Sequence, residues 1–241
     1  MQFSIVVPVY NEAQLIRSFL QNCRERAPGA EVIVADGGSS DGTPDLAAGL
    51  CNQIVVGERN RAAQMNLGAR AASGDVLWFV HVDAEVPREC LAEIARILND
   101  STVVGGYFRI RLPPDPVYRL TDGFAHYAGL LLRMRCGDHG MFCRRTAFVN
   151  VGGFAEVPLM EDVEFFRRLR RCGRVVCSDK RIVISPRRYE AIGPARLTFA
   201  YGFIAALYIF GVPLSVLARV YERTCCSAHD GGTSDARDCA S

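Results

Sequence analysis

The sequence has almost no net charge, and its first residues show no pattern typical of a targeting segment. Its 28 lysine and arginine residues nearly balance 26 aspartate and glutamate residues, which leaves +2 over 241 residues. A chain with this charge balance lacks the positive electrostatic field that is typical of nucleic-acid-binding proteins. We therefore expect no nucleic-acid partner. Residues 1–10 run directly into a strand pattern, with no basic region and no cleavable apolar stretch. This start predicts a cytoplasmic protein.

Several motifs for nucleotides, nucleophiles and zinc are also missing. There is no GxxxxGK[ST] phosphate loop, and no GxGxxG follows a strand pattern. The segment GGSSDG at 37–42 lacks the G-x-S-x-G order of a nucleophile elbow. The ten cysteines include no CxxC pair, which argues against a zinc knuckle. If the chain binds a nucleotide, a diphosphate held through a divalent metal is the better interpretation.

The sequence does contain strand and helix patterns in alternation. Short apolar, β-branched runs predict buried parallel strands at 3–10, 31–36, 53–57 and 75–83. Helical patterns separate them, so we expect a single α/β domain with a mostly parallel, Rossmann-like sheet and helices on both faces. The second half predicts strands at 103–112 and 140–145, helices at 116–134 and 161–173, and short strands within 174–184.

Polar side chains follow the predicted strands at their carboxyl ends. Glu12 comes after the first strand, Asp36 ends the second, and Asp83 ends the fourth. Ligands of such sheets bind at this edge, where the carboxylates of Asp36 and Asp83 are expected to meet. Oxygen ligands suit Mg²⁺ or Mn²⁺, which also bind substrate phosphates. Asp41 precedes glycine and is better explained as a turn residue.

Two further carboxylates, Glu161 and Asp162, stand at the start of a predicted amphipathic helix. Acidic residues in a first helical turn are ordinary partners of the helix dipole. A carboxylate held there is equally suited to act as a general base toward an acceptor hydroxyl. The residues alone leave both interpretations open.

Five motifs in order resemble the inverting family 2 glycosyltransferases, which have the GT-A fold. They are PVYNE, ADGGSSDGT, RAAQMNLGARAASGD, FVHVDAEVP, and GGF followed by MEDVEF. The resemblance covers residues 3–190 and is greatest to the short bacterial members. It implies a glycosyltransferase that moves a sugar from a nucleoside-diphosphate sugar to an acceptor hydroxyl with inversion. A UDP-sugar is the expected donor.

The resemblance also implies a role for individual residues. Asp162 matches the catalytic base, with Glu161 beside it, and Asp83 matches the last aspartate of the DxD motif that coordinates Mg²⁺ or Mn²⁺. The residues that it assigns to nucleotide binding are Pro8, Tyr10, Glu12, Asp36, Arg61, Arg187 and Arg188.

Two departures from the family pattern bear on these roles. Many members have paired aspartates where this chain has Asp36 followed by Gly37, so a different contact with the base is expected. His81 stands in place of the first aspartate of DxD. Histidine binds Mn²⁺ acceptably and Mg²⁺ only poorly, so the identity of the metal stays open.

Two alternatives to glycosyl transfer fit the sequence less well. A nucleotidyltransferase shares the α/β sheet and the metal, but PVYNE is not the basic glycine-rich loop usual in that class. A catalytically inactive, membrane-associated binding protein is disfavoured because Asp36, Asp83 and Asp162 are all present. The acceptor, lipid-linked or a small molecule, is not specified; Asp138 and His139 are candidates for contacting it.

The chain is expected to have three parts: a glycosyltransferase domain at 1–195, an apolar helical appendage at 196–223 and a disordered tail at 224–241. Residues 197–218 are uncharged and largely apolar, but Gly202, Gly211 and Pro213 interrupt them. A bent helix or helical hairpin on the cytoplasmic face of the membrane is therefore expected, rather than a span of about 20 residues. Plain packing or a homodimer contact is the alternative.

Overall fold

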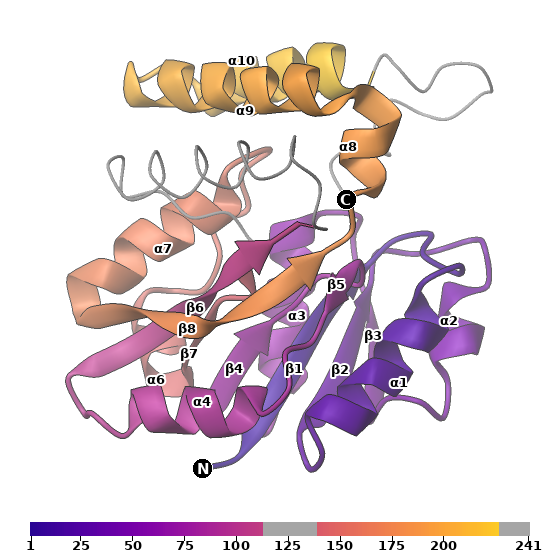
Figure 1. Ribbon diagram of the computed structural model, residues 1–241, viewed down its shortest axis with the longest axis vertical. Coiled ribbons are helices and arrows are strands. Elements are labelled where there is room, and N and C mark those ends of the chain that lie inside the picture. The colour runs from indigo at the N-terminus through magenta and orange to yellow at the C-terminus, as the bar shows by residue number, and fades with distance from the viewer. Residues whose placement is uncertain (113–138, 227–241) are drawn as a thin grey trace.

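The computed structural model describes residues 1–112 and 139–226, and within them one curled sheet runs through the domain (Figure 1). Its strand order is β3-β2-β1-β4-β7-β6-β8-β5. The parallel half contains β1 (Phe3–Val9), β2 (Glu31–Asp36), β3 (Gln53–Val56) and β4 (Val76–Phe79). The other half contains β5 (Ala84–Glu85), β6 (Val103–Arg111), β7 (Phe142–Arg144) and β8 (Arg174–Ile184). The predicted mostly parallel α/β sheet is confirmed.

Strand β7 introduces the antiparallel pairing, because it lies antiparallel to both β4 and β6. Strand β8 then runs parallel to β6, and the short β5 pairs antiparallel with β8. The segment 174–184, predicted as short strands, forms one strand with irregular register opposite β6. The predicted helix at 116–134 lies outside the described residues.

Helices cover both faces of the sheet, and the alternation of side chains along each strand explains why. In β1, Ile5 and Val7 belong to one apolar core, whereas Val6 belongs to the other. The first core includes side chains of α1 (Ile16–Arg26), α2 (Thr43–Ala47) and α4 (Cys90–Leu98). The second includes side chains of α3 (Arg61–Ala71), α6 (Arg145–Asn150) and α7 (Glu161–Cys172). A period-two pattern of apolar residues thus builds two cores around one sheet.

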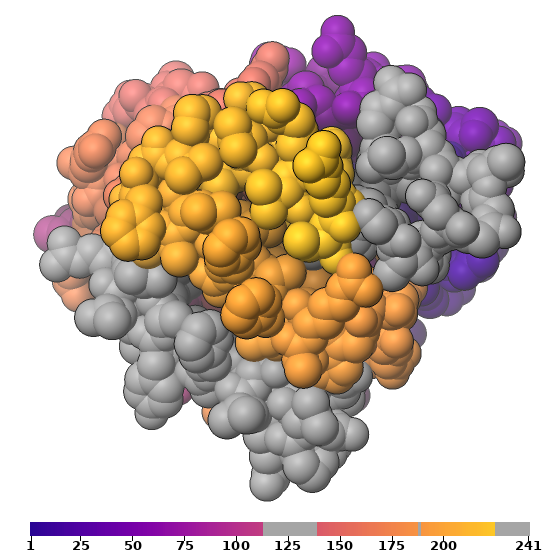
Figure 2. All heavy atoms as spheres, turned by 90° about the horizontal axis from the view of Figure 1, so that it is seen from above, coloured from indigo at the N-terminus to yellow at the C-terminus, as the bar shows by residue number. Residues whose placement is uncertain are grey.

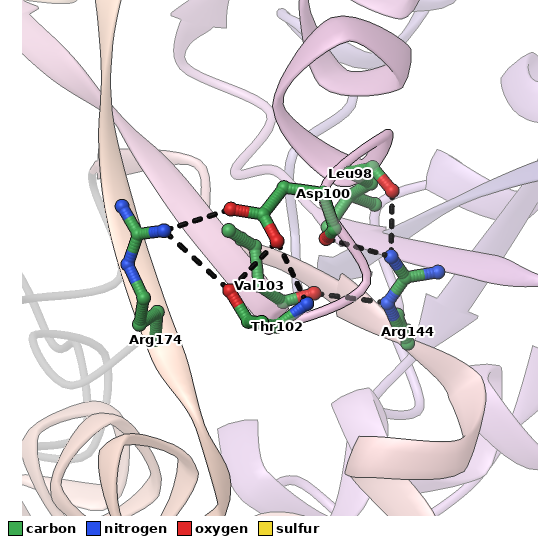
Figure 3. Close-up of polar contacts among 6 residues, drawn as sticks. All are labelled: Leu98, Asp100, Thr102, Val103, Arg144 and Arg174. Carbon is green, nitrogen blue, oxygen red and sulfur yellow. Dashed lines mark hydrogen bonds and ion pairs between the residues drawn. The ribbon is translucent and has the colours of Figure 1, made fainter.

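A polar network closes the turn between α4 and β6 (Figure 3). The Arg144 guanidinium, from β7, donates hydrogen bonds to the carbonyl oxygens of Leu98, Asp100 and Val103. Nη1 of Arg174, from β8, lies 2.7 Å from Oδ2 of Asp100. Helix ends leave carbonyl groups without helical partners, and Arg144 supplies donors for those of α4. Two strands that are distant in sequence are thereby joined to one turn.

The charge of Glu93, on α4, is stabilised by its neighbours. Hydrogen bonds from Arg96 and from the Ser178 hydroxyl lower the pKa of Glu93 to about 2, against the opposing effect of burial. Because the folded pKa lies below the unfolded value of about 4.3, this stabilisation is present above that value and is lost as the pH falls toward 2.

Glu93→Gln is therefore expected to lower the free energy of unfolding near neutral pH by about 1 kcal/mol, since Arg96 is exposed and solvent screens the pair. The deficit should shrink as the pH falls from about 4.3 toward 2, and urea titrations near neutral pH and near pH 3 measure it. Glu89→Gln, which removes an exposed partner of Lys180, is the control and should cost less. A deficit independent of pH would contradict the role given to the Glu93 charge.

The C-terminal helices lie together across one end of the domain. Helices α8 (Arg187–Ile192), α9 (Pro194–Ile209) and α10 (Leu214–Tyr221) occupy the end toward which the arrowheads of β6 and β8 point (Figure 1). The π-helical turn η2 (Glu222–Cys226) follows α10. Gly211 and Pro213 separate α9 from α10, whereas Gly202 stays within α9. Of the helices in the described residues, none combines the length and apolar character needed to cross a membrane.

Side chains of α9 attach this appendage to the start of α7. Leu197, Ala200 and Ile204 are buried in a small apolar cluster that includes Leu159 and Met160. At the other end of α9, the Tyr208 hydroxyl donates a hydrogen bond to Glu164 and accepts one from Arg167. Burial, followed by the hydrogen bond to Glu164, raises the pKa of Tyr208. The appendage is thus held at both ends against α7 and the segment before it.

Candidate functional site

Asp36 is fixed by the loop that follows β2. Its side chain is only 1% exposed, and Oδ2 accepts hydrogen bonds from the backbone N–H groups of Gly38 and Ser39 at 2.9 Å. The Ser39 hydroxyl donates to Oδ1 of Asp36 and accepts from the backbone N–H of Asn11. The end of β2 is thus joined to the loop after β1. A buried carboxylate held in this way has a fixed orientation toward the edge of the sheet.

A second set of contacts locks the same two loops together. Asp41 accepts hydrogen bonds from the backbone of Ala13 and from Thr43, whose hydroxyl in turn accepts the Glu12 N–H. Burial raises the pKa of Asp41, but the hydrogen bonds from Thr43 and Ala13 outweigh it and lower the pKa overall. Asp41 therefore acts within the loops, in agreement with the turn role expected for it.

Gln64 and Asn66 are polar residues of α3 whose contacts were not predicted from the sequence. The Gln64 amide nitrogen donates to the carbonyl oxygens of Val9 at 2.6 Å and Ala35 at 2.9 Å, at the carboxyl ends of β1 and β2. The Asn66 amide donates to Phe154 O and accepts from Phe154 N. Both are buried in a helix whose other buried residues are small or apolar, which the sequence pattern alone did not indicate. Helix α3 thus connects the strand ends to the segment before α7.

Arg61 and Glu161 link α3 to the start of α7. Arg61 is the first residue of α3, and its Nη1 lies 3.5 Å from Oε1 of Glu161. Glu161 and Asp162 are each only 7% exposed, and Asp162 Oδ1 accepts the Val163 N–H at 2.6 Å. Met160, just before them, has a left-handed backbone with φ of 66°. The structure therefore brings three of the predicted residues, Arg61, Glu161 and Asp162, together.

Contacts with the segment at the start of α8 link three more of the predicted residues, Asp83, Glu12 and Arg187. The Ser185 N–H donates to the carbonyl oxygen of Asp83 at 3.0 Å, in the segment after β4. Two residues later, Arg187 Nη2 lies 3.2 Å from Oε1 of Glu12. Asp83, Glu12 and Arg187 thus belong to one set of neighbouring segments at the sheet edge. Arg188 follows Arg187 in α8, and its side chain is outside the described part of the structure.

The remaining predicted residues occupy different surroundings. Pro8 is buried within β1 beside Ala35 of β2. Tyr10 follows β1, and the Arg59 guanidinium carbon lies 3.9 Å from its ring centroid, a cation–π distance that the sequence did not predict. His139 packs edge-on against Tyr107 of β6, with ring centroids 5.7 Å apart. Asp138 lies outside the described residues.

The predicted metal ligands form a small donor set. In the ranges 1–112 and 139–226, no group of three or more His, Cys, Asp and Glu side chains could hold a metal ion by itself. Asp83 and His81 supply one carboxylate and one imidazole, both partly exposed. Such a set fits an ion that takes most of its ligands from substrate phosphates and water, as Mg²⁺ and Mn²⁺ commonly do.

Comparison with known proteins agrees with this architecture. The protein-family model described as Glycosyl transferase family 2 matches residues 4–156, more than half of the chain. An undecaprenyl-phosphate 4-deoxy-4-formamido-L-arabinose transferase of Serratia proteamaculans is 27% identical over 118 residues, 44% of this chain and 36% of that protein. The succinoglycan biosynthesis protein ExoA of Rhizobium meliloti is 24% identical over 82% of this chain and 67% of its own length. The chain thus spans about a third of the first relative and two thirds of the second.

Solved structures show the same fold at low sequence identity. The mannosyltransferase PcManGT from Pyrobaculum calidifontis, in complex with GDP-Man and Mn²⁺, has a TM-score of 0.66 and 22% identity; the match covers 98% of this chain and 77% of that one. TarS from S. aureus, in complex with UDP-GlcNAc, has a TM-score of 0.61 and 18% identity, over 77% of this chain and 58% of that one. The chain belongs to glycosyl transferase family 2 and has the GT-A-type fold of a glycosyltransferase domain.

Proposed function

We propose that this chain transfers a sugar from a nucleoside-diphosphate sugar to an acceptor hydroxyl, with inversion and with help from a divalent metal. The supporting observation is the pair of contact chains at one edge of the sheet. One leads from the ends of β1 and β2 through Gln64 and helix α3 to Arg61 and Glu161. The other leads from Asp83 through Ser185 and Arg187 to Glu12.

The residues at the end of the first contact chain are suited to proton transfer. The Arg61 guanidinium faces Glu161, and Asp162 is the adjacent carboxylate at the same helix start. We assign Asp162 as the general base, which takes the proton of the acceptor hydroxyl as its oxygen attacks the anomeric carbon. Glu161, through its ion pair with Arg61, orients the start of α7. A single displacement from the face opposite the leaving group inverts the anomeric configuration.

The second contact chain is suited to binding the nucleoside diphosphate, which is the leaving group. Asp36 is assigned to the base, with Pro8, Tyr10 and Glu12 near the base and ribose and with Arg61 near the nucleotide. A metal bound at Asp83, with His81 as a further candidate ligand, would stabilise negative charge that develops on the phosphates. Mn²⁺ or Mg²⁺ fits the carboxylate, and the imidazole favours Mn²⁺. Arg187 adds positive charge beside this turn, because Ser185, two residues before it, contacts the Asp83 backbone. Arg188 is assigned to the diphosphate from the sequence alone.

The acceptor and location are proposed from the names of the relatives. Several are called undecaprenyl-phosphate transferases, which names a lipid phosphate as the acceptor of those proteins. We assign this chain an amphiphilic, lipid-linked acceptor that differs from those lipid phosphates in presenting a hydroxyl as its reacting group, and a place on the cytoplasmic face of the membrane. His139, together with Asp138, is kept as a candidate acceptor contact.

A screen of UDP-sugars and GDP-sugars by thermal unfolding, with and without Mn²⁺, tests the donor assignment. A ligand that binds only the folded state at 100 times its Kd should stabilise it by about 2.7 kcal/mol. The UDP-sugar is expected to give the larger shift, and only in the presence of the metal. Release of a nucleoside diphosphate, rather than pyrophosphate, separates glycosyl transfer from nucleotidyl transfer. Donor binding with no release under any acceptor would favour the inactive binding protein, and a retained anomeric configuration would exclude the inverting mechanism.

A further inference from the structure

Helix α9 exposes a row of large apolar side chains. Phe199, Phe203, Ile209 and Phe210 are 76%, 46%, 52% and 85% exposed, respectively. Phe203 and Phe210 are seven residues apart, and Phe199 lies one turn before Phe203, so the three phenylalanines share one face. The rings of Phe199 and Phe203 stack with centroids 6.3 Å apart. We call the three phenylalanines the aromatic face of α9. Apolar residues grouped in this way mark a surface that meets a partner.

The opposite side of α9 is already used for packing. Leu197, Ala200 and Ile204 are buried against the segment that contains Leu159 and Met160. Seen from above, α9 and α10 lie side by side at the surface of the molecule (Figure 2). The aromatic face therefore points away from the domain, and the buried side of the same helix attaches it to the domain.

The charges around the aromatic face indicate which kind of partner it binds. Arg196 lies seven residues before Phe203 and hence on the same side of α9, while Arg219 and Arg223 are exposed on α10 and η2. The sequence from 191 to 221 contains no aspartate or glutamate. Arginine stems lie along apolar surface while their guanidinium groups reach anionic lipid headgroups. In a second copy of this chain, the same face would present arginines to arginines without acidic partners.

We propose that the aromatic face of α9 docks on an anionic lipid bilayer, with α9 in the plane of the interface. An interfacial helix inserts aromatic side chains at the boundary between headgroups and acyl chains, and its basic residues bind the anionic surface. The buried side of the same helix contacts Met160, which immediately precedes Glu161 and Asp162. Docking would thus hold the proposed catalytic edge close to the bilayer. This purpose rests on the proposed function, whereas the docking itself does not.

Sedimentation with lipid vesicles tests the proposal. The full chain is expected to bind vesicles of phosphatidylcholine mixed with phosphatidylglycerol, and to bind pure phosphatidylcholine much less. Binding should weaken as salt is raised, since the arginines contribute through a screened field. Replacing Phe199, Phe203 and Phe210 together by serine should lower the partition constant by at least about tenfold. Because these side chains are exposed, the variant should keep the wild-type thermal unfolding midpoint.

Val149→Ser is the matched control. Val149 is 67% exposed on α6, away from α9, and its replacement should leave vesicle binding unchanged. A second measurement uses a fluorescent reporter, because the only native tryptophan, Trp78, is fully buried. Emission of Phe203→Trp should shift to shorter wavelength when anionic vesicles are added, and emission of Val149→Trp should not.

Three results would overturn the proposal: no binding of the wild-type chain to anionic vesicles, equal binding by the triple serine variant, or an unshifted Phe203→Trp emission. A concentration-dependent dimer in sedimentation velocity, abolished by the same serine substitutions and accompanied by no vesicle binding, would assign the face to a second copy instead. Calorimetry of UDP with Mn²⁺ in lipid-free buffer separates this failure from failure of the proposed function. Vesicle binding without nucleotide binding would contradict only the proposed function and leave the docking proposal standing.

Discussion

Asp162→Asn is expected to lower turnover by about 10² or more and to change donor binding little. Asparagine keeps the shape of the side chain and can still accept the Val163 N–H, so the start of α7 should be preserved. What it cannot do is take a proton from the acceptor hydroxyl. The loss should therefore appear in kcat, with the donor Kd from calorimetry close to that of the wild-type chain.

Glu164→Gln provides a control at the same helix start. Glu164 also belongs to the first turn of α7, but its carboxylate accepts a hydrogen bond from Tyr208 of α9. Glutamine can accept the same bond, so turnover should fall far less than in Asp162→Asn. Near-normal turnover in the Asp162 variant would reduce Asp162 to an acidic residue that interacts with the helix dipole. Equal losses in the two variants would point to a disturbed helix start rather than a missing base.

The parallel half of the fold was predictable because β1, β2 and β4 are buried on both faces, and only the edge strand β3 is partly exposed. Such strands are continuous apolar runs, and the predicted segments 3–10, 31–36 and 53–57 agree closely with β1, β2 and β3. The segment 75–83 was predicted too long. Strand β4 ends at Phe79, although Val80 and Val82 beyond it are also buried. Burial continues into the turn that contains Asp83, so apolar character alone does not locate the end of the strand.

In the other half of the sheet, strands were predicted at 103–112, 140–145 and within 174–184, but their pairing was not predictable from local patterns. Strand β7 has three residues and lies between β4 and β6, which belong to distant parts of the chain. The pairing of such strands depends on close backbone approach: a Cβ on Gly106 of β6 would come within 2.4 Å of the Phe142 ring and 2.6 Å of Val176 O. Periodicity reports which face a residue occupies, not which strand lies beside it.

The candidate site shows the same division between local and long-range information. The placement of Glu12, Asp36 and Asp83 after strand patterns follows from the rule for ligand sites in parallel sheets. The contacts between Arg61 and Glu161 and between Glu12 and Arg187 join residues 100 and 175 positions apart in the sequence, and no local pattern contains them. Gln64 was missed because an amide in a helix resembles any polar surface residue until its carbonyl partners are known.

Asp83→Asn is expected to abolish the metal-dependent part of nucleoside diphosphate binding. The substitution removes the negative charge from the proposed ligand, and an amide oxygen is a much weaker ligand for a hard cation than a carboxylate. The fold should survive, because two contacts that hold this turn, from the Ser185 N–H to the Asp83 carbonyl oxygen and from the Ala84 N–H to the His81 carbonyl oxygen, belong to the backbone. Calorimetric titration of UDP with and without Mn²⁺ measures the effect independently of turnover.

Asp75→Asn is the matched control for Asp83. Asp75 immediately precedes β4, at the opposite end of that strand, and its carboxylate accepts the Gln2 N–H. Both substitutions remove one carboxylate beside the same strand, but only Asp83 lies at the edge to which Arg187 and Glu12 belong. UDP affinity should therefore rise with Mn²⁺ in the wild-type chain and in Asp75→Asn, and should be independent of Mn²⁺ in Asp83→Asn. An unchanged Mn²⁺ effect in the Asp83 variant would remove the metal from this turn while leaving the assignments of Asp36 and Asp162 untouched, because neither depends on it.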